Sequence, residues 1–420
     1  MANPISIAQG IFSKAGPKYY SLLLYLQALA EYWMSPMGWR GGHNARMHLL
    51  RFNSKLHDHQ KPSRIAIFVG FSNKLTLSNK SYLESLACAN YCIFYVSNCQ
   101  LTNEAKEALA SLAWKVTERY NLGRDIGAYR DAVLWLRDQG FLQFCEILII
   151  ANDSMQFLPG KYGGSLVDSL RRFEDSSNVA LFSHISYMHA LHFQSFFQVL
   201  KKSVFNSREF QRFWEKYIPL SHRGHCIFNG EIGISKSVYN KLTEIEVLYT
   251  SSRLQASLEK NYSNNLAPSA NDLMRLMPSP TRTRKRKKRN HILESLADAA
   301  NPGEALPYHK LYLLSEIIEN SNSSHVCAFL FPLFLQCPLV KKDICLAGSF
   351  SIAQAALLLR EALESSMREN SPAVDIEEYL EEYSTALSLN GTPLTHASMP
   401  RMAALKGVTS GFVYSDIYDR

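Results

Sequence analysis

Two short segments of the sequence combine residue types that can hold a phosphorylated ligand. The first, residues 118–131, contains two glycines four positions apart and three arginines: Gly123, Gly127, Arg119, Arg124 and Arg130. Glycines let backbone N–H groups approach a ligand closely, a helix start favours negative charge, and guanidinium groups donate charge-assisted hydrogen bonds to phosphate. We expect this segment to suit a nucleotide diphosphate. The alternative that it leaves open is a tight turn in which Asp125 caps the next helix.

The second segment follows the most apolar run of the chain. Asn152, Asp153 and Ser154 come directly after residues 145–151. A carboxylate at the end of a buried strand, flanked by amide and hydroxyl oxygens, offers the hard ligands that Mg²⁺ or Mn²⁺ takes beside a diphosphate. Taken alone, Asn-Asp-Ser is more often an ordinary turn. Its position one strand after the first segment favours a shared site.

Both segments lie at the ends of apolar runs that alternate with helix-like stretches. The runs are 64–69, 91–96, 114–118, 145–151 and 179–183, and the stretches between them are 77–89, 102–112, 127–139 and 164–173. Strands that are apolar throughout and separated by helices are typical of a parallel sheet covered on both faces. The sequence therefore predicts an α/β fold. Because right-handed crossovers bring the carboxyl ends of such strands to one edge, ligand chemistry is expected there.

Changes in residue composition along the chain suggest four parts. Residues 1–60 are expected to form an N-terminal helical segment, 61–250 the α/β domain, 251–307 a basic, irregular linker or lid, and 308–420 a helical C-terminal region. Helices in the last part are expected at 308–319, 351–369 and 375–387. Aromatic residues recur at helical spacing in residues 207–217, which indicates core packing.

Composition excludes several classes of protein. With 46% apolar and 20% charged residues, the chain can bury enough surface to fold. Several of its 8 cysteines lie inside apolar runs, which is typical of a reducing cytoplasm, and the lack of a CxxC pair argues against a zinc knuckle. The N-terminal region shows no signal-peptide pattern, and its apolar stretch at 19–30 is shorter than the roughly 20 residues of a membrane span. Neither a secreted nor an integral membrane protein is indicated.

The net charge of +8 comes almost entirely from one segment. Seven of the eight residues 282–289 are Lys or Arg, so the remainder of the chain is nearly neutral. Such a run repels itself and is expected to be an exposed loop. It contains no aromatic residue on which a base could stack, so nucleic acid is not the expected partner.

Five short motifs together resemble a known family. In order along the chain they are Asn121-Leu-Gly-Arg-Asp-Ile-Gly127, Ile149-Ile-Ala-Asn-Asp-Ser154, His192-Phe-Gln-Ser-Phe-Phe197, Phe210-Gln-Arg-Phe-Trp214 and Asn229-Gly-Glu-Ile-Gly-Ile-Ser235. This set is similar to the rhamnan synthesis protein F family, bacterial glycosyltransferases of polysaccharide assembly. The resemblance covers roughly residues 60–250, with a weaker trace to about 345.

The resemblance implies a GT-A-like sheet with a nucleotide-sugar site. The residues implied to bind the nucleotide sugar are Gly70, Arg119, Asn121, Gly123, Arg124, Asp125, Gly127 and Asn152. Asp153 is the implied ligand of Mg²⁺ or Mn²⁺. The acidic motif has one aspartate where the usual form has two, which weakens the expected metal affinity. Asp125 would supply a second carboxylate if the two loops converge.

The remaining motifs point to the acceptor side of such a site. An inverting transfer needs a base that removes the proton of the acceptor hydroxyl, and Glu231, which lies close to two glycines, is the candidate. The alternative is that Glu231 is only an acidic residue at the start of a helix. His192 and Gln194 are expected to contact the acceptor, and Ser195 is given a general substrate-facing role.

The leading interpretation is an inverting glycosyltransferase. It would transfer a sugar, plausibly rhamnose, from a nucleotide-diphosphate donor such as dTDP-rhamnose. The acceptor would be a lipid-linked glycan or a growing cell-surface polysaccharide such as O-antigen. We expect it in the cytoplasm, where the basic run would favour a peripheral position on the inner face of the plasma membrane. The alternatives are a scaffold subunit that binds nucleotide sugar without turnover and a nucleic-acid-binding protein that uses the basic run.

Overall fold

The chain folds as two units, Gln27–Leu248 and Met1–Leu26 together with Tyr249–Arg420. The computed structural model describes residues 17–34, 47–49, 61–187, 190–263, 275–277, 307–310, 322–344, 350–367 and 375–391, and the single residues 291, 294, 295, 298 and 304. The basic run 282–289 and most of the helix expected at 308–319 lie outside the described residues. The four-part division stays a prediction.

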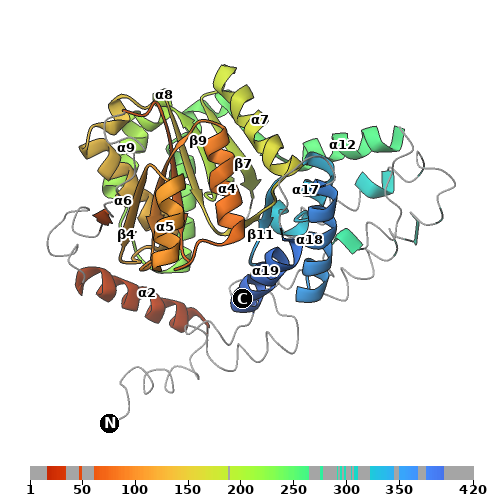
Figure 1. Cartoon of the computed structure of the whole chain (residues 1–420), viewed down its shortest axis with the longest axis horizontal. Coiled ribbons are helices and arrows are strands. Elements are labelled where there is room, and N and C mark those ends of the chain that lie inside the picture. The colour runs from red at the N-terminus through yellow and green to blue at the C-terminus, as the bar shows by residue number, and fades with distance from the viewer. Residues whose placement is uncertain are drawn as a thin grey trace, which may run out of the picture. The chain divides into compact units, whose positions relative to one another are not determined.

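The unit Gln27–Leu248 is built on one sheet (Figure 1). Among the described residues nine strands form it, in the order β1-β4-β3-β2-β5-β9-β7-β10, with β8 paired to β7. Their bounds are β1 Met47–Leu49, β2 Arg64–Gly70, β3 Cys92–Ser97, β4 Lys115–Arg119, β5 Ile147–Asn152, β7 Ala180–Ser186, β8 His192–Phe193, β9 Phe197–Lys201 and β10 Ile245–Tyr249.

The four central strands are parallel, as the apolar runs predicted. β2 pairs in parallel with β3 and with β5, and β3 pairs in parallel with β4. Both faces of this region are covered, since neighbouring residues such as Ile67 and Phe68 are both fully buried although they point to opposite faces. The α/β class is therefore confirmed.

The sheet is mixed, whereas the sequence predicted only parallel strands. β9 lies between β5 and β7 and runs antiparallel to both, and β1 runs antiparallel to β4 at the edge. The apolar run that forms β9 follows β7 through a short hairpin with β8, without an intervening helix. A short chain return of this kind can only produce antiparallel pairing, because a parallel neighbour needs a crossover of a dozen or more residues.

Helices cover the two faces of the sheet separately. On one face α6 (Arg124–Asp138) and α9 (Arg208–Lys216) join a buried cluster with β2 that includes Ile67, Tyr129 and Trp214. This confirms the predicted packing role of the aromatic residues in 207–217. On the other face Tyr82 of α4 (Leu77–Cys88) lies 4.5 Å from Phe157 and 5.2 Å from Phe68, between ring centroids. α4 also contacts α5 (Asn103–Leu112) and α7 (Lys161–Asp175) (Figure 1).

The smaller elements of this unit occupy the connections. They are η2 (Phe141–Gln143), β6 (Met155–Phe157), α8 (Lys202–Phe205), α10 (Arg223–His225), the π-helical turn η3 (Cys226–Glu231), α11 (Ile232–Lys236) and η4 (Tyr239–Glu244). The motif Asn229–Ser235 begins in this π-helical turn and continues into α11.

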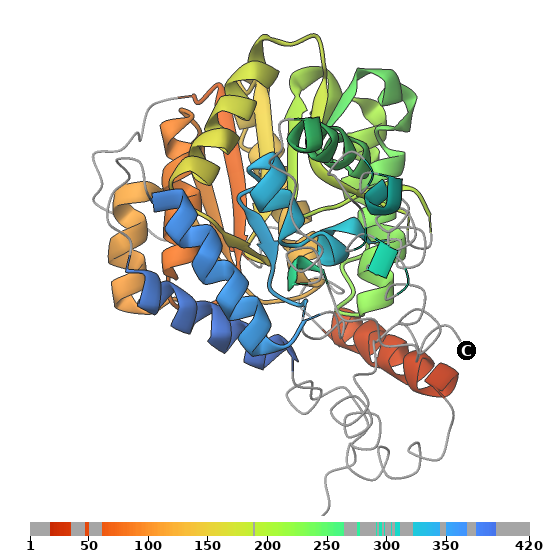
Figure 2. The ribbon, with the colours of Figure 1, turned by 90° about the vertical axis from the view of Figure 1, so that its right-hand side faces the viewer.

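The second unit is largely helical, as predicted. Its described elements are α12 (Ser251–Ser263), α16 (Ser323–Val326), α17 (Leu330–Leu335), β11 (Leu339–Lys341), α18 (Ile352–Met367) and α19 (Ile376–Gly391). α18 and α19, expected at 351–369 and 375–387, pack side by side (Figure 2). Helix α2 (Pro17–Met34) leaves Leu22, Leu26 and Trp33 more than half exposed. None of the described helices combines the length and apolarity that a bilayer crossing requires.

A buried ion pair fixes the middle of α6 against the sheet. Nε and Nη2 of Arg119, the last residue of β4, lie 3.0 and 2.9 Å from Asp131 Oδ2 in α6, and both side chains are fully buried. The same guanidinium donates to Asn98 Oδ1 after β3 and to the carbonyl of Leu122. One side chain therefore sets the relative position of two strand ends, the loop 120–123 and α6.

We expect Asp131→Asn to lower the free energy of unfolding by about 3–5 kcal/mol, because it leaves a buried guanidinium without its counter-charge. Urea unfolding followed by circular dichroism measures this. The matched control is Glu215→Gln, which breaks a partly exposed pair with Arg137 and should change stability by less than about 1 kcal/mol. Equal effects of the two substitutions would contradict the structural role given to Asp131.

Candidate functional site

The site lies where the order of the strands reverses. β3 and β4 lie on one side of β2, and β5 lies on the other. In open α/β sheets the crevice at the carboxyl ends of the strands flanking such a reversal is where ligands bind. Val69 of β2 and Asn152 of β5 are paired at this edge, so the predicted acidic motif begins at the reversal itself.

Asp153 joins the ends of the two strands. Its backbone N–H donates to the carbonyl of Val69 (3.0 Å), and its Oδ2 accepts from the N–H of Phe71 (2.8 Å). Its carboxylate is therefore held at the point where β2 and β5 both end, although it remains partly accessible.

The two predicted loops converge. Asn152 Nδ2 donates to Asp125 Oδ2 at 2.8 Å, while Asp125 Oδ1 accepts from the N–H of Ile126 at 3.0 Å. Asn152 Oδ1 accepts from the N–H of Ser154, which fixes the amide. The side chain of Asp125 is thus bonded to the residue that directly precedes Asp153.

Glu231 reaches the same region from a different element. It ends the π-helical turn η3, a rare conformation that is often found at functional sites. A Cβ on Gly230 would lie 3.1 Å from the side chain of Ile126 in α6, and one on Gly233 would lie 2.5 Å from Phe213 in α9. The two glycines therefore let the turn pack closely on both helices. Ser195 Oγ donates to Glu231 Oε1 at 3.0 Å, and His192 Nε2 lies 3.6 Å from Oε2.

Carboxylates of the candidate site raise the pKa of two buried tyrosines. Burial, then Asp125 and more weakly Glu231 and Asp153, raise the pKa of Tyr129 well above its usual value. Burial and Cys226 raise the pKa of Tyr217, to which Asp125 and Glu231 again contribute. A carboxylate raises the pKa of a nearby phenol because it opposes a second negative charge. Both phenols therefore stay neutral within reach of the same acids.

Four residues implied to bind the nucleotide contribute to the packing of the protein. The guanidinium of Arg119 is fully buried and bonds to Asp131, Asn98 and Leu122. A Cβ on Gly70 would lie 2.0 Å from Tyr95 Oη, one on Gly123 2.4 Å from Pro219, and one on Gly127 2.2 Å from the carbonyl of Leu122. At all three positions the missing side chain lets another part of the protein approach closely.

Asn121 and Arg124 keep groups that a ligand could use. Arg124 is exposed and has φ of 56°, an uncommon value outside glycine that concentrates at functional sites. Asn121 is half-buried, and its Oδ1 has no hydrogen-bond partner within the part of the chain that the structure describes. A buried amide oxygen without a partner is costly, and a bound ligand or water would relieve that cost.

His192 and Gln194 lie behind Glu231. They are only 3% and 6% exposed, and their Nε2 atoms are 3.3 Å apart. The expected contact with an acceptor is therefore indirect. Tyr129 and Tyr217 received no chemical role from the sequence, although a hydroxyl on an otherwise aromatic packing face was a signal that could have marked them.

The donor set at the strand reversal fits a hard divalent cation. Asp153 and Asp125 offer carboxylate oxygens, and Mg²⁺ usually takes one or two protein carboxylates together with substrate phosphates. No group of three or more His, Cys, Asp or Glu side chains that could hold a metal occurs among the described residues.

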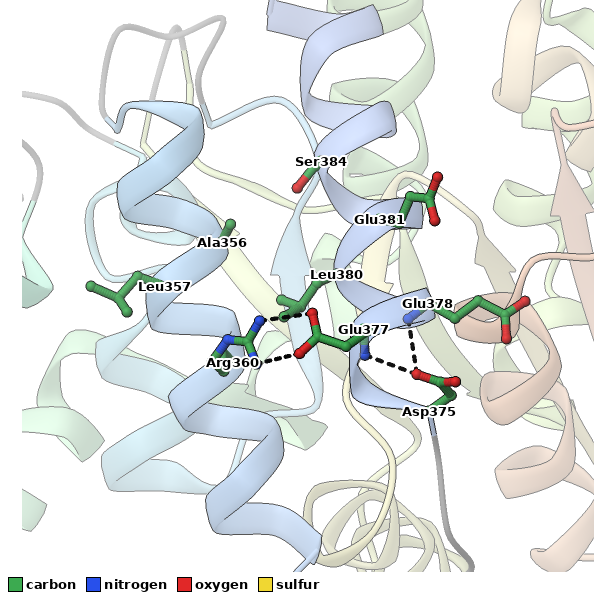
Figure 3. Close-up of a pocket in the computed structure, with 9 residues that line it drawn as sticks. All are labelled: Ala356, Leu357, Arg360, Asp375, Glu377, Glu378, Leu380, Glu381 and Ser384. Carbon is green, nitrogen blue, oxygen red and sulfur yellow. Dashed lines mark hydrogen bonds and ion pairs between the residues drawn. The ribbon is translucent and has the colours of Figure 1, made fainter.

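A separate pocket lies between α18 and α19 in the helical unit (Figure 3). Arg360 donates to both carboxylate oxygens of Glu377, at 2.6 and 2.9 Å, and Asp375 Oδ1 accepts from the N–H groups of Glu377 and Glu378. Helix pairing and capping account for these contacts. None of the residues predicted to act on a substrate lines it.

A mixed α/β sheet with polar residues gathered at the strand reversal defines the class of this protein as α/β. The family model described as Rhamnan synthesis protein F matches residues 93–274, which confirms the resemblance drawn from the motifs. This segment contains every predicted site residue except Gly70. The protein is accordingly glycosyltransferase-like.

The individual relatives are distant. Uncharacterized protein y4gN of Sinorhizobium fredii is 25% identical over 187 residues, 44% of this chain and 48% of that protein, so the match spans about half of the relative's length. Core-mannan synthase A of Aspergillus fumigatus, in an Mn/GDP form, aligns with a TM-score of 0.30 and 12% identity over 48% of this chain and 77% of that one. Mannosyltransferase Ktr4p of S. cerevisiae aligns with a TM-score of 0.28 and 10% identity over 56% of this chain and 79% of that one. Such low TM-scores carry no functional conclusion.

We expect Gly127→Ala to destabilise the protein by about 1–3 kcal/mol, because the added methyl group meets a backbone oxygen that cannot move freely. Gly164 of α7 is the matched control, since a Cβ there meets nothing within 4 Å. Gly164→Ala should stabilise by about 0.5–1 kcal/mol through helix propensity. Thermal and urea unfolding measure both, and effects of the same sign would contradict the close approach of Leu122 to Gly127.

Proposed function

We propose that this protein is a glycosyltransferase that moves a sugar from a nucleoside-diphosphate donor to a growing cell-surface polysaccharide or lipid-linked glycan. The observation that carries the proposal is the convergence of Asp125, Asp153 and Glu231, from three different elements, around Tyr129 at the strand reversal. The match to the rhamnan synthesis family favours rhamnose, and therefore dTDP-rhamnose, as the donor to test first.

In the proposed reaction the diphosphate lies at the ends of β2 and β5, in a GT-A-like arrangement. Asp153, helped by Asp125, would hold Mg²⁺ or Mn²⁺, which offsets negative charge on the leaving diphosphate. Asn121, Arg124 and Asn152 lie on the loops that border this position. Arg124 is the exposed cation among them and can donate charge-assisted hydrogen bonds to phosphate.

Glu231 is the proposed base. As the acceptor oxygen forms its bond to the anomeric carbon, Glu231 takes the hydroxyl proton, and the bond from that carbon to the diphosphate oxygen breaks with its electron pair on the diphosphate. A single displacement of this kind inverts the anomeric centre. Glu231 has 23% of its side chain exposed, so its carboxylate remains accessible to an acceptor.

A lipid-linked acceptor would bring the reaction to the inner face of the plasma membrane. The exposed side chains of Leu22, Leu26 and Trp33 on α2, together with the basic residues 282–289, supply apolar and cationic groups suited to an anionic lipid surface. We therefore propose a cytoplasmic protein that associates peripherally with the membrane.

The second candidate function is binding of a nucleotide sugar without transfer. The acidic motif supplies one aspartate, and Asp125 is already bonded to Asn152, so metal affinity could be too weak for turnover. This alternative predicts tight donor binding without release of nucleoside diphosphate. The proposed enzyme releases it.

A thermal-shift panel of dTDP-rhamnose, UDP-glucose and GDP-mannose, with and without Mn²⁺, tests donor and metal together, because a ligand that binds only the folded state raises Tm. We expect one donor to raise Tm, and to raise it further with Mn²⁺. Asp153→Asn should abolish the added effect of Mn²⁺ while leaving the Tm without ligand within a few degrees. An undiminished Mn²⁺ effect in this variant would refute the metal assignment.

We expect Glu231→Gln to lower the rate of sugar transfer or donor hydrolysis by about 10²–10⁴-fold, because the amide cannot accept the acceptor proton. Donor affinity should not change. Release of nucleoside diphosphate measures the rate, and Glu246→Gln in β10 is a matched control that should keep wild-type turnover. Full activity of the Glu231 variant would remove it as the base.

A further inference from the structure

The carboxylate of Glu231 is held on both sides by residues of one short segment, 192–195. We infer that Ser195 and His192 are positioning residues, which orient the Glu231 carboxylate toward the acceptor hydroxyl and do not themselves touch a substrate. This inference rests on the proposed function, since it needs Glu231 to act as a base.

Ser195 is fixed at two points. Its Oγ donates to Glu231 Oε1 at 3.0 Å, and its carbonyl accepts from the hydroxyl of Tyr129 in α6 at 3.2 Å. The residue is 2% exposed, so water does not compete for its hydroxyl. A hydrogen bond to a charged acceptor in such a setting is among the stronger ones in proteins. Ser195 therefore ties one carboxylate oxygen to the position of α6.

His192 limits the other oxygen. Its Nδ1 lies 2.8 Å from the carbonyl of Ala190, and because a carbonyl only accepts, Nδ1 must carry a hydrogen. Nε2 then faces the amide of Gln194 at 3.3 Å and Glu231 Oε2 at 3.6 Å. The distance to Oε2 is longer than a hydrogen bond, and an Nε2 that accepts from Gln194 has no hydrogen to donate, so the imidazole ring restricts the space open to Oε2 by its bulk. The backbone N–H of Gln194 donates to the carbonyl of His184 and holds this arrangement on β7.

The backbone of Glu231 is tied to the same segment. Ser235 Oγ donates to the carbonyl of Glu231 at 2.9 Å and accepts from the N–H of Phe193 at 2.9 Å. Residues 192–195 therefore hold both the main chain and the carboxylate of Glu231. A glutamate side chain has three rotatable bonds, and contacts at both ends leave it few orientations.

Exposure separates this role from a substrate contact. Ser195 and His192 are 2% and 3% exposed, whereas 23% of the Glu231 side chain is exposed. An acceptor can reach the carboxylate but meets almost no surface of the two residues behind it. They can influence transfer only through Glu231.

A double-mutant cycle tests this statement, because residues that act through one another have non-additive effects. The measurement is nucleoside-diphosphate release, with water as acceptor, from whichever of dTDP-rhamnose, UDP-glucose or GDP-mannose the wild type turns over fastest. We expect Ser195→Ala to lower kcat by about 10–100-fold at unchanged donor KM, as misplacement of a catalytic group does. In the Glu231→Gln background the same substitution should have no further effect.

Two variants and one control complete the cycle. Ser195→Thr keeps the hydroxyl and should recover most of the lost kcat. His192→Ala removes the ring and should lower kcat in wild type but not in Glu231→Gln. Ser237→Ala is the control, because Ser237 Oγ donates to the carbonyl of Ile234 and does not touch Glu231. It should leave kcat unchanged in both backgrounds.

The outcomes separate the inference from the proposed function. No release from any of the three donors by the wild type would overturn the proposed function and this inference with it. Active wild type, slowed but measurable Glu231→Gln and a Ser195→Ala loss that persists in the Glu231→Gln background would overturn only the inference and assign Ser195 to substrate contact or to folding. Increased donor KM in Ser195→Ala would do the same.

Discussion

Burial of the four parallel strands on both faces is the constraint on which the rest of this structure depends. Backbone groups inside such a sheet bond to one another, and side chains on both faces must be apolar, so polar chemistry is confined to the strand ends. At the strand reversal those ends are joined by Asp153, which bonds to backbone groups from both sides of the end of β2. The acidic motif therefore contributes to the sheet and to the site at once.

A second set of polar groups is buried beside this edge, and its members form hydrogen bonds with one another. Asn152 bonds to Asp125, Ser195 to Glu231, and Tyr129 to the carbonyl of Ser195. Each pairing satisfies a group that would otherwise be costly to remove from water. The π-helical turn and its glycines place Glu231 within reach of this set. A network of this kind distinguishes the site from an ordinary strand edge.

Much of the fold could be predicted from local pattern. The five apolar runs became β2, β3, β4, β5 and β7, and the helices between them lie within a few residues of their predicted bounds. β9 was not predicted, because it follows the β7–β8 hairpin without an intervening helix and so falls outside the strand–helix alternation. For the site, Asp125, Asn152, Asp153 and Glu231 were named from residue type and position. Arg119 was predicted to bind the ligand because the sequence does not show that the fold pairs its guanidinium with Asp131.

The sequence alone determined the α/β class, the family resemblance and the residue types capable of the chemistry, because periodicity and short motifs are local properties. Only the tertiary structure decided which of those residues meet. It assigned Gly70, Gly123 and Gly127 to packing and placed His192 and Ser195 behind Glu231, since both outcomes depend on contacts between residues far apart in the chain. The physical reason is that burial and close approach are set by the whole fold, which brings together residues that are distant in the sequence.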